Sequence, residues 1–400
     1  MTKKSDAPAI RFKGFSDAWE QRKLGELALF NPKDELPQTF EYVDLESVVG
    51  TEMLSHRTEV KSSAPSRAQR LAHTGDLFYQ TVRPYQKNNY LFEKPDNNYV
   101  FSTGYAQMRP YVDGYFLLSL VQSERFVKVV LDNCTGTSYP AINANDLAEI
   151  EVAAPSDESE AQRIGTIFRS IDNLITLHQR KFEKLTNVKK SMLEKMFPQN
   201  GSSYPEIRFK GFTDPWEQRK VGNLLIERNQ QAPMSDEYPL MAFIANEGVA
   251  PKGERYDRSA LVTDTVNKLY KKTEKGDFIY SSNNLETGSI GLNKYGKACI
   301  SPVYSIFEPT GIADSDFLGR RLVRKDFINA MVKWRQGVIY GQWRIHESDF
   351  LKIEITVPSV EEQRKIGAYL DQLDNLITLH QRKLEKLQNI KKSMLEKMFV

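Results

Sequence analysis

The chain has 400 residues, of which 40% are apolar, 27% charged and 11% aromatic, enough material for two or three globular domains. Its net charge of +3 excludes a strongly basic protein, so any nucleic-acid surface must come from local clusters of side chains. The longest apolar stretch, residues 116–121, is far shorter than the roughly 20 residues of a membrane span, and no apolar signal segment follows Lys3 and Lys4. Two lone cysteines, Cys134 and Cys299, exclude a disulfide scaffold. We therefore expect a cytoplasmic chain that makes no membrane contact.

The chain is a tandem repeat with a period of about 200 residues. Residues 10–25 return almost unchanged as residues 207–222. Residues 172–197 return as residues 374–399, with changes only at positions 182, 186 and 188 of the first copy. Between these copies the sequence diverges. Each half therefore has a variable segment followed by a nearly identical one, which predicts two duplicated domains rather than a solenoid.

The nearly identical segments predict two long helices. Asp157 with Glu160, and Ser359 with Glu362, are capping boxes or near variants that mark the two helix starts. Apolar side chains then recur at steps of three and four, the spacing of a helical seam about 60 Å long. Because the copies occupy equivalent places in tandem halves, a pseudo-two-fold arrangement would run the helices antiparallel. The predicted helix-pair interface is Ile171, Leu174, His178, Phe182, Leu185, Val188 and Met192 in the first helix, and Leu373, Leu376, His380, Leu384, Leu387, Ile390 and Met394 in the second.

The predicted fold class is α+β: two tandem mixed α/β domains separated by two long, antiparallel, coiled-coil-like helices. Short β-rich runs between turn residues predict the mixed domains, and Asp17 and Asp214 are predicted to open short helices. The predicted boundaries are a disordered tail at 1–9, a first variable domain at 10–155, a first helical spacer at 156–198, a linker at 199–206, a second variable domain at 207–357 and a second helical spacer at 358–400.

Motifs for catalysis are incomplete wherever they occur. Residues 291–298 resemble a phosphate-binding loop, but Ala298 stands where Ser or Thr is required, and a strand-like run follows, so we expect a hairpin turn. Asp44, Glu59 and Lys61 are the residue types of a metal-dependent nuclease, but their spacing is loose and the second half lacks the pattern, which favours a solvated edge strand. The five histidines form no cluster with ligand spacing. We therefore predict no catalytic residue and no metal site.

Polar loops at matching positions of the two halves indicate two DNA readers. The loops follow a matched strand, Gly75–Tyr79 or Gly276–Tyr280, or precede a matched isoleucine. Arginine and lysine can pair with guanine edges, and asparagine and glutamine with adenine edges, although an ordinary solvated loop is the alternative for any single residue. The predicted DNA-contacting residues are Arg67, Arg83, Gln86, Asn89 and Tyr139 for the first domain, and Arg258, Asn283, Asn284, Gln342 and Arg344 for the second.

The whole chain resembles the specificity subunit of a type I restriction-modification system. The resemblance is carried by Trp19–Leu27, by the helix entry Glu361–Ile366 and by the helix body Leu376–Lys383. The family implies that the chain binds double-stranded DNA and recruits two methylation subunits, and that two restriction subunits with motor and nuclease activity join for cleavage. It also implies that S-adenosylmethionine, ATP and Mg²⁺ act on those partners, and that no cofactor is bound by this chain.

The residues and the resemblance lead to the same hypothesis. Each variable domain reads one short half-site in the major groove, and the helices hold the two readers near one DNA turn apart, about 34–36 Å. Three alternatives stay open. A stand-alone duplicated DNA-binding regulator would bind tightly without a partner. A nuclease built on Asp44 would cut DNA alone with Mg²⁺. A structural coiled-coil adaptor would tolerate exchange of the loops with no change in DNA preference.

Overall fold

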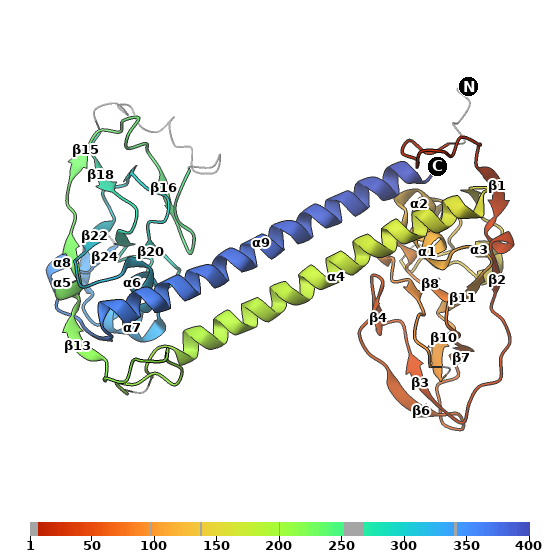
Figure 1. Ribbon diagram of the computed structural model, residues 1–400, viewed down its shortest axis with the longest axis horizontal. Coiled ribbons are helices and arrows are strands. Elements are labelled where there is room, and N and C mark those ends of the chain that lie inside the picture. The colour runs from red at the N-terminus through yellow and green to blue at the C-terminus, as the bar shows by residue number, and fades with distance from the viewer. Residues whose placement is uncertain (1–6, 97, 137, 200, 252–267, 340–341) are drawn as a thin grey trace. The chain divides into compact units, whose positions relative to one another are not determined.

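The computed structural model describes residues 7–96, 98–136, 138–199, 201–251, 268–339 and 342–400 (Figure 1). Contacts between Cα atoms divide the chain into two compact units, of which unit 1 holds residues 1–181 and 380–400 and unit 2 holds residues 182–379. Each unit therefore contains one variable domain together with parts of both long helices. No helix within the described ranges is both long and apolar enough to cross a membrane.

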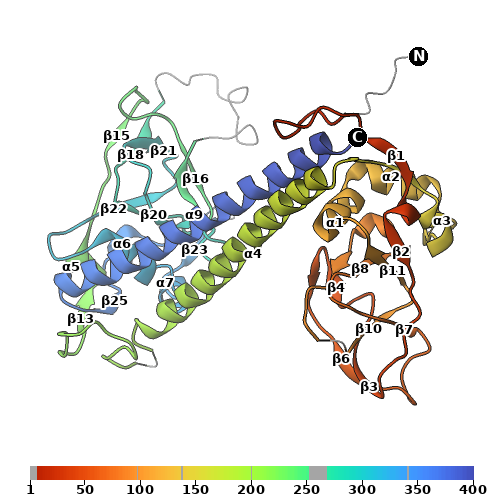
Figure 2. The same ribbon diagram turned by 45° about the vertical axis from the view of Figure 1, so that its right-hand side comes forward.

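The variable domain of unit 1 is built from two four-stranded sheets, the two-stranded ladders β1-β12 and β4-β5, and short helices. Sheet β6-β3-β10-β7 contains a parallel pair, β3 with β10, whereas sheet β2-β11-β8-β9 is antiparallel throughout. In Figures 1 and 2, the first of these sheets lies at the end of the domain away from α1 and α2. The strands are β1 (Glu20–Lys23), β2 (Ala28–Phe30), β3 (Thr39–Val43), β4 (Val48–Val49), β5 (Glu52–Met53), β6 (Arg57–Val60), β7 (Ala68–Leu71), β8 (Leu77–Gln80), β9 (Tyr90–Leu91), β10 (Tyr99–Ser102), β11 (Tyr105–Pro110) and β12 (Glu151–Ala154); the helices are α1 (Gly114–Gln122), α2 (Glu124–Asp132) and α3 (Ala144–Ala148).

The variable domain of unit 2 repeats part of this plan. Sheet β14-β22-β19-β20 has the same strand order as β2-β11-β8-β9, and the ladder β13-β25 corresponds to β1-β12. The strands are β13 (Glu217–Lys220), β14 (Leu225–Glu227), β15 (Gln231–Ala232), β16 (Ala242–Ile244), β17 (Gly248–Ala250), β18 (Tyr270–Thr273), β19 (Phe278–Tyr280), β20 (Ile290–Leu292), β21 (Ala298–Ile300), β22 (Ser305–Pro309), β23 (Gln336–Ile339), β24 (Gln342–Arg344) and β25 (Glu354–Val357). The helices are α5 (Val221–Leu224), α6 (Ser315–Arg321), α7 (Lys325–Val332) and α8 (Glu347–Phe350).

The two predicted short helices after Asp17 and Asp214 are strands instead. Glu20–Lys23 pairs antiparallel with β12, and Glu217–Lys220 pairs antiparallel with β25. Trp19 and Trp216, which precede these strands, are each 3% exposed and belong to the cores of their units. Burial of a large indole side chain outweighs the weak local preference for a capped helix turn.

The two long helices are α4 (Glu158–Lys195) and α9 (Val360–Met398), and within each unit their segments lie side by side (Figure 2). In unit 1, Lys391 Nζ is 2.7 Å from Asp172 Oδ1, and in unit 2, Lys189 Nζ is 2.5 Å from Asp374 Oδ1. The repeat maps Asp172 onto Asp374 and Lys189 onto Lys391, so the two ion pairs are copies of one another. Within each unit, an early residue of one helix thus contacts a late residue of the other, as antiparallel helices require.

Two residues of the predicted seam between the helices, one in each helix, are buried. Ile171 and Leu373 are 7% and 6% exposed, but Leu174, Leu376 and Ile390 are 43%, 42% and 39% exposed. The prediction of a buried interface is therefore wrong for these last three residues, because two helices cover only a narrow stripe of one another. The other seam positions are partly buried: Leu185, Val188 and Met192 against the core of unit 2, Met394 against the core of unit 1, and His178, His380, Phe182, Leu384 and Leu387 along the helices.

The predicted caps form in part, since Asp157 Oδ1 accepts from Ser159 N at 2.8 Å and Ser359 Oγ accepts from Glu362 N at 3.4 Å, but the two glutamates form buried ion pairs instead of the return bonds of a capping box. The Glu160 carboxylate accepts hydrogen bonds from Arg11 Nε and Nη2 at 2.6 and 2.8 Å, and from Trp19 Nε1 at 3.2 Å. In unit 2, Glu362 accepts the corresponding pair of bonds from Arg208 at 2.7 and 2.8 Å. The repeated Ile-Arg-Phe sequence therefore attaches the start of each variable domain to the first turn of the following helix.

Single glycines inside α4 and α9 permit a close contact with the variable domains. A Cβ atom added to Gly165 would lie 1.8 Å from Asp113 Oδ1, and one added to Gly367 would lie 2.6 Å from Asp314 Oδ1. Asp113 and Asp314 are the N-caps of α1 and α6. Glycine in the interior of a helix lowers its stability by roughly 1 kcal/mol relative to alanine. Both glycines nevertheless fit here, because a side chain at either position would push the helix away from the domain.

Candidate nucleic-acid interface

A strained turn in the first variable domain carries Arg83. Arg83 and Lys87 have left-handed backbones, with φ of 55° and 56°, on either side of a 3-10 turn over Pro84–Gln86. Such conformations cost about 1–3 kcal/mol for residues other than glycine and collect at binding sites. The Arg83 backbone N–H donates to Pro140 O at 2.8 Å, so the turn is held against residues 135–141.

Arg83 and Tyr139, both predicted to contact DNA, lie together. The Arg83 guanidinium carbon is 4.5 Å from the centre of the Tyr139 ring, and Tyr139 is 64% exposed. Arg67 is also exposed, and its carbonyl accepts from Thr103 N at 2.8 Å. A planar cation on an exposed aromatic ring can both stack and donate hydrogen bonds, as nucleic-acid recognition requires.

Asn89 supports this turn from inside instead of contacting DNA. It is 1% exposed, and its Oδ1 accepts from Gln80 N at 2.9 Å. The prediction of a base contact is wrong for Asn89, because its amide is used to hold the backbone of the strand before the turn. Gln86 is exposed, and its Oε1 accepts from Gln80 Nε2 at 2.8 Å.

The second domain brings two of its predicted loops together in the same way. Ile345 N donates to Ser282 Oγ at 3.1 Å, so the loop with Asn283 and Asn284 packs beside the end of β24. Asn283 is half-buried and Asn284 is exposed. The Arg344 side chain is 62% exposed, with Nη2 3.9 Å from Glu347 Oε2.

Two predicted residues of this domain are not placed as side chains. Arg258 lies outside the described residues, and Gln342 is described only as a backbone position of β24, opposite Ile339.

The residues with nuclease chemistry form ion pairs with an arginine. Arg57 Nη1 is 2.7 Å from Asp44 Oδ2, and Arg57 Nε is 2.8 Å from Glu59 Oε1. Lys61 Nζ instead donates to the Leu36 carbonyl at 3.2 Å. The residues that the structure describes contain no group of three or more His, Cys, Asp or Glu that could hold a metal ion.

The loop that resembles a phosphate site is a turn between two sheets. Asn293 Oδ1 accepts from the backbone N–H groups of Tyr295 and Gly296, at 2.9 and 3.1 Å. The strands on either side, β20 and β21, pair with β19 and β18, so the expected hairpin is wrong. A strand, not a helix N-terminus, follows the turn, and the loop therefore lacks the backbone cradle for phosphate.

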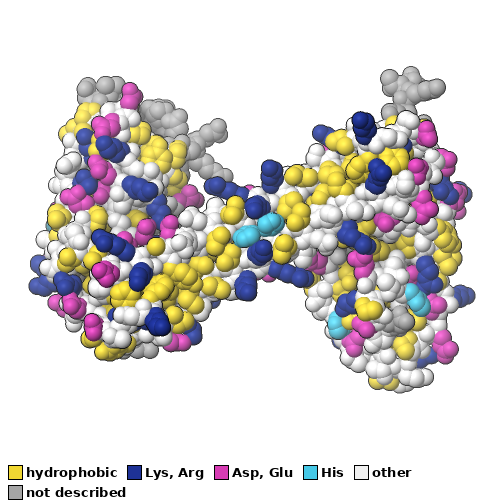
Figure 3. All heavy atoms as spheres, in the orientation of Figure 1, with side chains coloured by type: hydrophobic (Ala, Val, Ile, Leu, Met, Phe, Trp, Pro, Cys, Tyr) yellow, Lys and Arg dark blue, Asp and Glu magenta, His cyan; other side chains and the backbone are white. Residues whose placement is uncertain are grey.

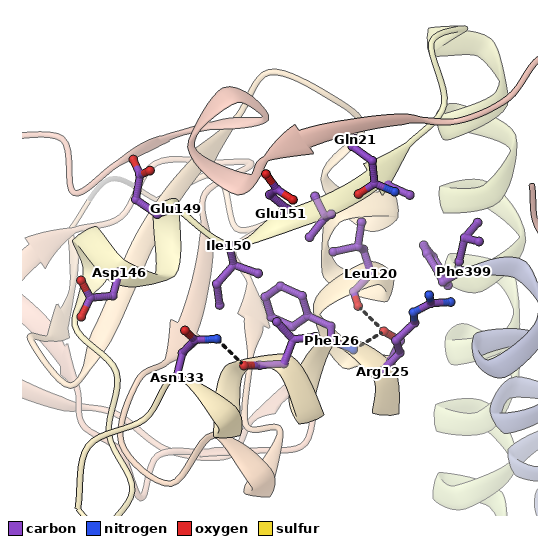
Figure 4. A pocket seen from close by; sticks show the side chains of 15 residues that line it. Gln21, Leu120, Arg125, Phe126, Asn133, Asp146, Glu149, Ile150, Glu151 and Phe399 are labelled. Atoms are coloured by element: carbon purple, nitrogen blue, oxygen red, sulfur yellow. Dashed lines mark hydrogen bonds between the residues drawn. The ribbon is translucent and has the colours of Figure 1, made fainter. Parts of the chain in front are cut away.

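A pocket of about 580 Å³ in unit 1 has the wrong charge for DNA. Its apolar lining comes from Leu120, Phe126, Ile150 and Phe399, among others. Figure 4 shows Asp146 and Glu149 on one side of this pocket and Arg125 and Phe399 on the other. Asp146, Glu149 and Glu151 together give the lining more carboxylates than cations, which would repel a phosphate backbone. We therefore place the candidate interface on the Arg83–Tyr139 surface.

A histidine pair joins α4 to α9 in unit 1. His178 Nδ1 and His380 Nδ1 are 2.8 Å apart, so only one of the two atoms can carry a proton while the hydrogen bond exists. Figure 3 shows histidine side chains, in cyan, on the surface that the long helices form. Burial lowers the pKa of both histidines, and the charges of Lys181 and Lys383 lower it further. Because each histidine is the repeat counterpart of the other, the pair meets at equivalent positions of the two helices.

We expect acid to weaken the helix pair through these histidines. Their folded-state pKa lies below the ordinary value of about 6.5, so the unfolded chain binds more protons as the pH falls through that value, and stability is lost. The double variant His178→Gln/His380→Gln should lose less thermal stability between pH 7.5 and pH 5 than the natural chain. His346→Gln, at an exposed histidine, is the control. Equal pH dependence of all three proteins would contradict the prediction.

The comparisons with known proteins all point to one family. The family described as "Type I restriction modification DNA specificity domain" matches residues 17–187 and 214–389, which is most of the chain. A type I restriction enzyme specificity subunit of Methanocaldococcus jannaschii, MjaVIII, is 25% identical over 307 residues, covering 71% of this chain and 68% of that protein.

One solved structure shares the fold at low sequence identity. The type I restriction-modification system S subunit from M. genitalium superposes with a TM-score of 0.61 at 14% identity, covering 98% of this chain and 99% of that one. The HsdS subunit from Thermoanaerobacter tengcongensis has a TM-score of 0.44 at 22% identity, covering 95% and 96% of the two chains. At these identities the first of them supports the tandem arrangement of the fold alone.

Proposed function

Because this chain belongs to the family of type I restriction-modification specificity subunits, we propose that each of its variable domains reads one half of a split DNA target. The family assignment confirms the prediction of a non-catalytic subunit, since specificity subunits leave catalysis to their partners. The two halves of the target should differ in sequence and flank a gap of unspecified bases.

The observation that carries this proposal is the matched placement of unlike loops. In the first domain, Arg83 follows β8 and packs beside the segment before Ile142. In the second domain, the loop with Asn283 and Asn284 follows β19 and packs beside Ile345. The position after the strand thus holds a cation in one domain and amides in the other, which suits two readers of different sequences.

Polar contacts between each variable domain and the helix segments of the same unit support the proposal that the helices hold the domain in a fixed position. In unit 1, Thr176 Oγ1 donates to Glu52 Oε1 at 2.9 Å, and Arg169 pairs with Glu93. In unit 2, Arg320 Nη2 is 2.9 Å from Asp374 Oδ2, and Lys294 Nζ is 2.7 Å from Asp371 Oδ1. We propose that α4 and α9 set the distance between the half-sites, near one turn of DNA.

The helices also offer matched surfaces for partner subunits. Leu174 and Leu177 in α4 are 43% and 45% exposed, and their counterparts Leu376 and Leu379 in α9 are 42% and 45% exposed. Two like surfaces would recruit two like methylation subunits, with two restriction subunits joining for cleavage. S-adenosylmethionine, ATP and Mg²⁺ would act on those partners, and the cytoplasmic location stays a prediction.

The test is a map of methylated bases after co-expression with a candidate methylation subunit. The natural chain should give a split target with two unlike halves, and a contiguous palindromic target would contradict the proposal. Tight, specific DNA binding by the purified chain without any partner would favour a stand-alone regulator instead.

Two matched variants assign the halves of the target. Arg83→Ala should relax one position of the first half, and Arg344→Ala one position of the second, each by about 1–3 kcal/mol of discrimination. The expected map keeps the untouched half at full specificity in both cases. A uniform loss of binding on all sequences would instead make either arginine a phosphate contact.

A further inference from the structure

An arginine without a partner lies in a pocket of the first variable domain. Arg70 on β7 is half-buried, and its Nε is completely buried with no hydrogen-bond partner among the described residues. No carboxylate in those ranges forms an ion pair with it. Burial alone lowers the pKa of Arg70, since no neighbouring charge acts on it. A buried Nε–H without an acceptor is costly, and a ligand that supplies an acceptor would remove that cost.

The pocket around Arg70 opens beside the candidate interface. It has a volume of about 380 Å³ and is lined by Thr81 and Val82, which precede Arg83, and by Thr135 and Ala141, which flank the loop of Tyr139. Val82 forms a β-bridge with Ala141, and so does Thr135. The segments that present Arg83 and Tyr139 are therefore also walls of the Arg70 pocket.

The rest of the lining mixes apolar side chains such as Val82 and Ile142 with polar groups, and some of those polar groups already have partners. Asp146 is the carboxylate of the pocket, and its Oδ2 accepts from Asn143 Nδ2 at 2.5 Å, not from Arg70. Thr81 Oγ1 donates to the Gly104 carbonyl at 2.8 Å. Thr103 and Asn133 complete the polar lining. Hydroxyl and amide groups of this kind suit the edge of a base better than an apolar ligand.

The second domain has a cation at the same place in its fold. Counting back from the matched strands Gly75–Tyr79 and Gly276–Tyr280, Arg70 corresponds to Lys271. Arg70 lies opposite Phe101 in the β7–β10 ladder, and Lys271 lies opposite Ile300 in the β18–β21 ladder. Lys271 is 8% exposed, and within the described residues it too has no ion-pair partner. Two domains that differ in most loops thus both keep, on this strand, a basic residue that has no ion-pair partner among the described residues.

We propose that Arg70 and Lys271 are specificity-determining residues, each donating to the O6 and N7 edge of a guanine in the half-site that its own domain reads. The inference rests on the proposed function. The arginine guanidinium can donate two hydrogen bonds in a fixed geometry that matches this edge, whereas the lysine ammonium is a compact point charge. The two residues should therefore differ in how strongly they discriminate guanine from the other bases. Because burial already restricts both side chains, each loses less freedom on binding than an exposed side chain would.

The experiment uses the complex with a methylation subunit and maps methylated bases for Arg70→Gln, Arg70→Lys and Lys271→Gln. Arg70→Gln should relax one G·C position of the first half by roughly 5- to 150-fold and leave the second half unchanged. Lys271→Gln should do the reverse. Arg70→Lys should keep binding to non-specific DNA but still lose discrimination at that position, because the charge remains and the fork is gone.

Arg22→Gln, at a surface arginine of the same domain, is the matched control and should leave the map unchanged. A uniform loss on all sequences, a relaxed A·T position or an unaltered map would each overturn the inference for Arg70. Thermal unfolding identifies a variant that fails to fold. If Arg70→Gln fails to fold, the map of Arg70→Lys tests the inference instead. A contiguous target for the natural chain would refute the proposed function itself, whereas a split target with an intact first half in Arg70→Gln refutes only this inference.

Discussion

Insertion of four residues into each of α4 and α9 is expected to change the preferred target to one whose halves stand about two base pairs further apart. Four helical residues add about 6 Å, and one base pair of DNA rises about 3.4 Å. The insertions belong after Gln179 and after Gln381, which are equivalent positions of the repeat, so that the antiparallel pairing of the helices is kept. The bases within each half should not change, since the variable domains are untouched.

The measurement is the map of methylated bases in cells that also make the methylation subunit. Four residues inserted after Gly201, in the linker, are the matched control, because they add the same length outside the helix pair and should leave the gap as it was. If the helix-lengthened protein keeps its preference for the original gap, the helices do not set the spacing.

Replacement of Glu160 by Gln is expected to cost about 3–5 kcal/mol of unfolding free energy. The Glu160 carboxylate is 1% exposed and accepts two bonds from Arg11, which is itself 14% exposed. A neutral amide would leave the Arg11 charge buried without compensation and would disturb the bond from Trp19 Nε1. Since these contacts attach residues 10–19 to α4, unit 1 should lose most of the stability.

Denaturant unfolding measures this loss. The equivalent variant Glu362→Gln removes the pair with Arg208 in unit 2 but no bond from Trp216, and it should therefore cost somewhat less. The double variant Arg11→Met/Glu160→Met is the control for a specific ion pair, because apolar partners of similar size are expected to be close to neutral. An unaltered midpoint in Glu160→Gln would show that the buried pair contributes little.

Long-range pairing explains where the sequence reading was wrong. The residues around Asp17 have a local preference for a capped helix turn, but Glu20–Lys23 forms a ladder with Glu151–Ala154, more than a hundred residues away. Glu160 has the spacing of a capping box, but its partner is Arg11 of the preceding domain. In both cases the contact forms with a segment far away in the sequence. The local sequence around Asp17 or Glu160 does not contain these distant partners, so it cannot predict the contacts.

The sequence by itself determined the duplication, the two long helices and the family. A repeat can be found by comparing the chain with itself, and a helical period near 3.6 residues can be found from the spacing of nearby apolar residues. It also located the polar loops, since they keep their register with the matched strands. Only the tertiary structure decided which members of those loops face outward. In the sequence, Asn89 and Arg70 are both simply polar residues of a variable segment. In the structure, Asn89 accepts a hydrogen bond from the backbone of Gln80, whereas Arg70 Nε has no hydrogen-bond partner among the described residues. Burial depends on what the folded chain brings against each side chain, and this is fixed by contacts between segments far apart in sequence.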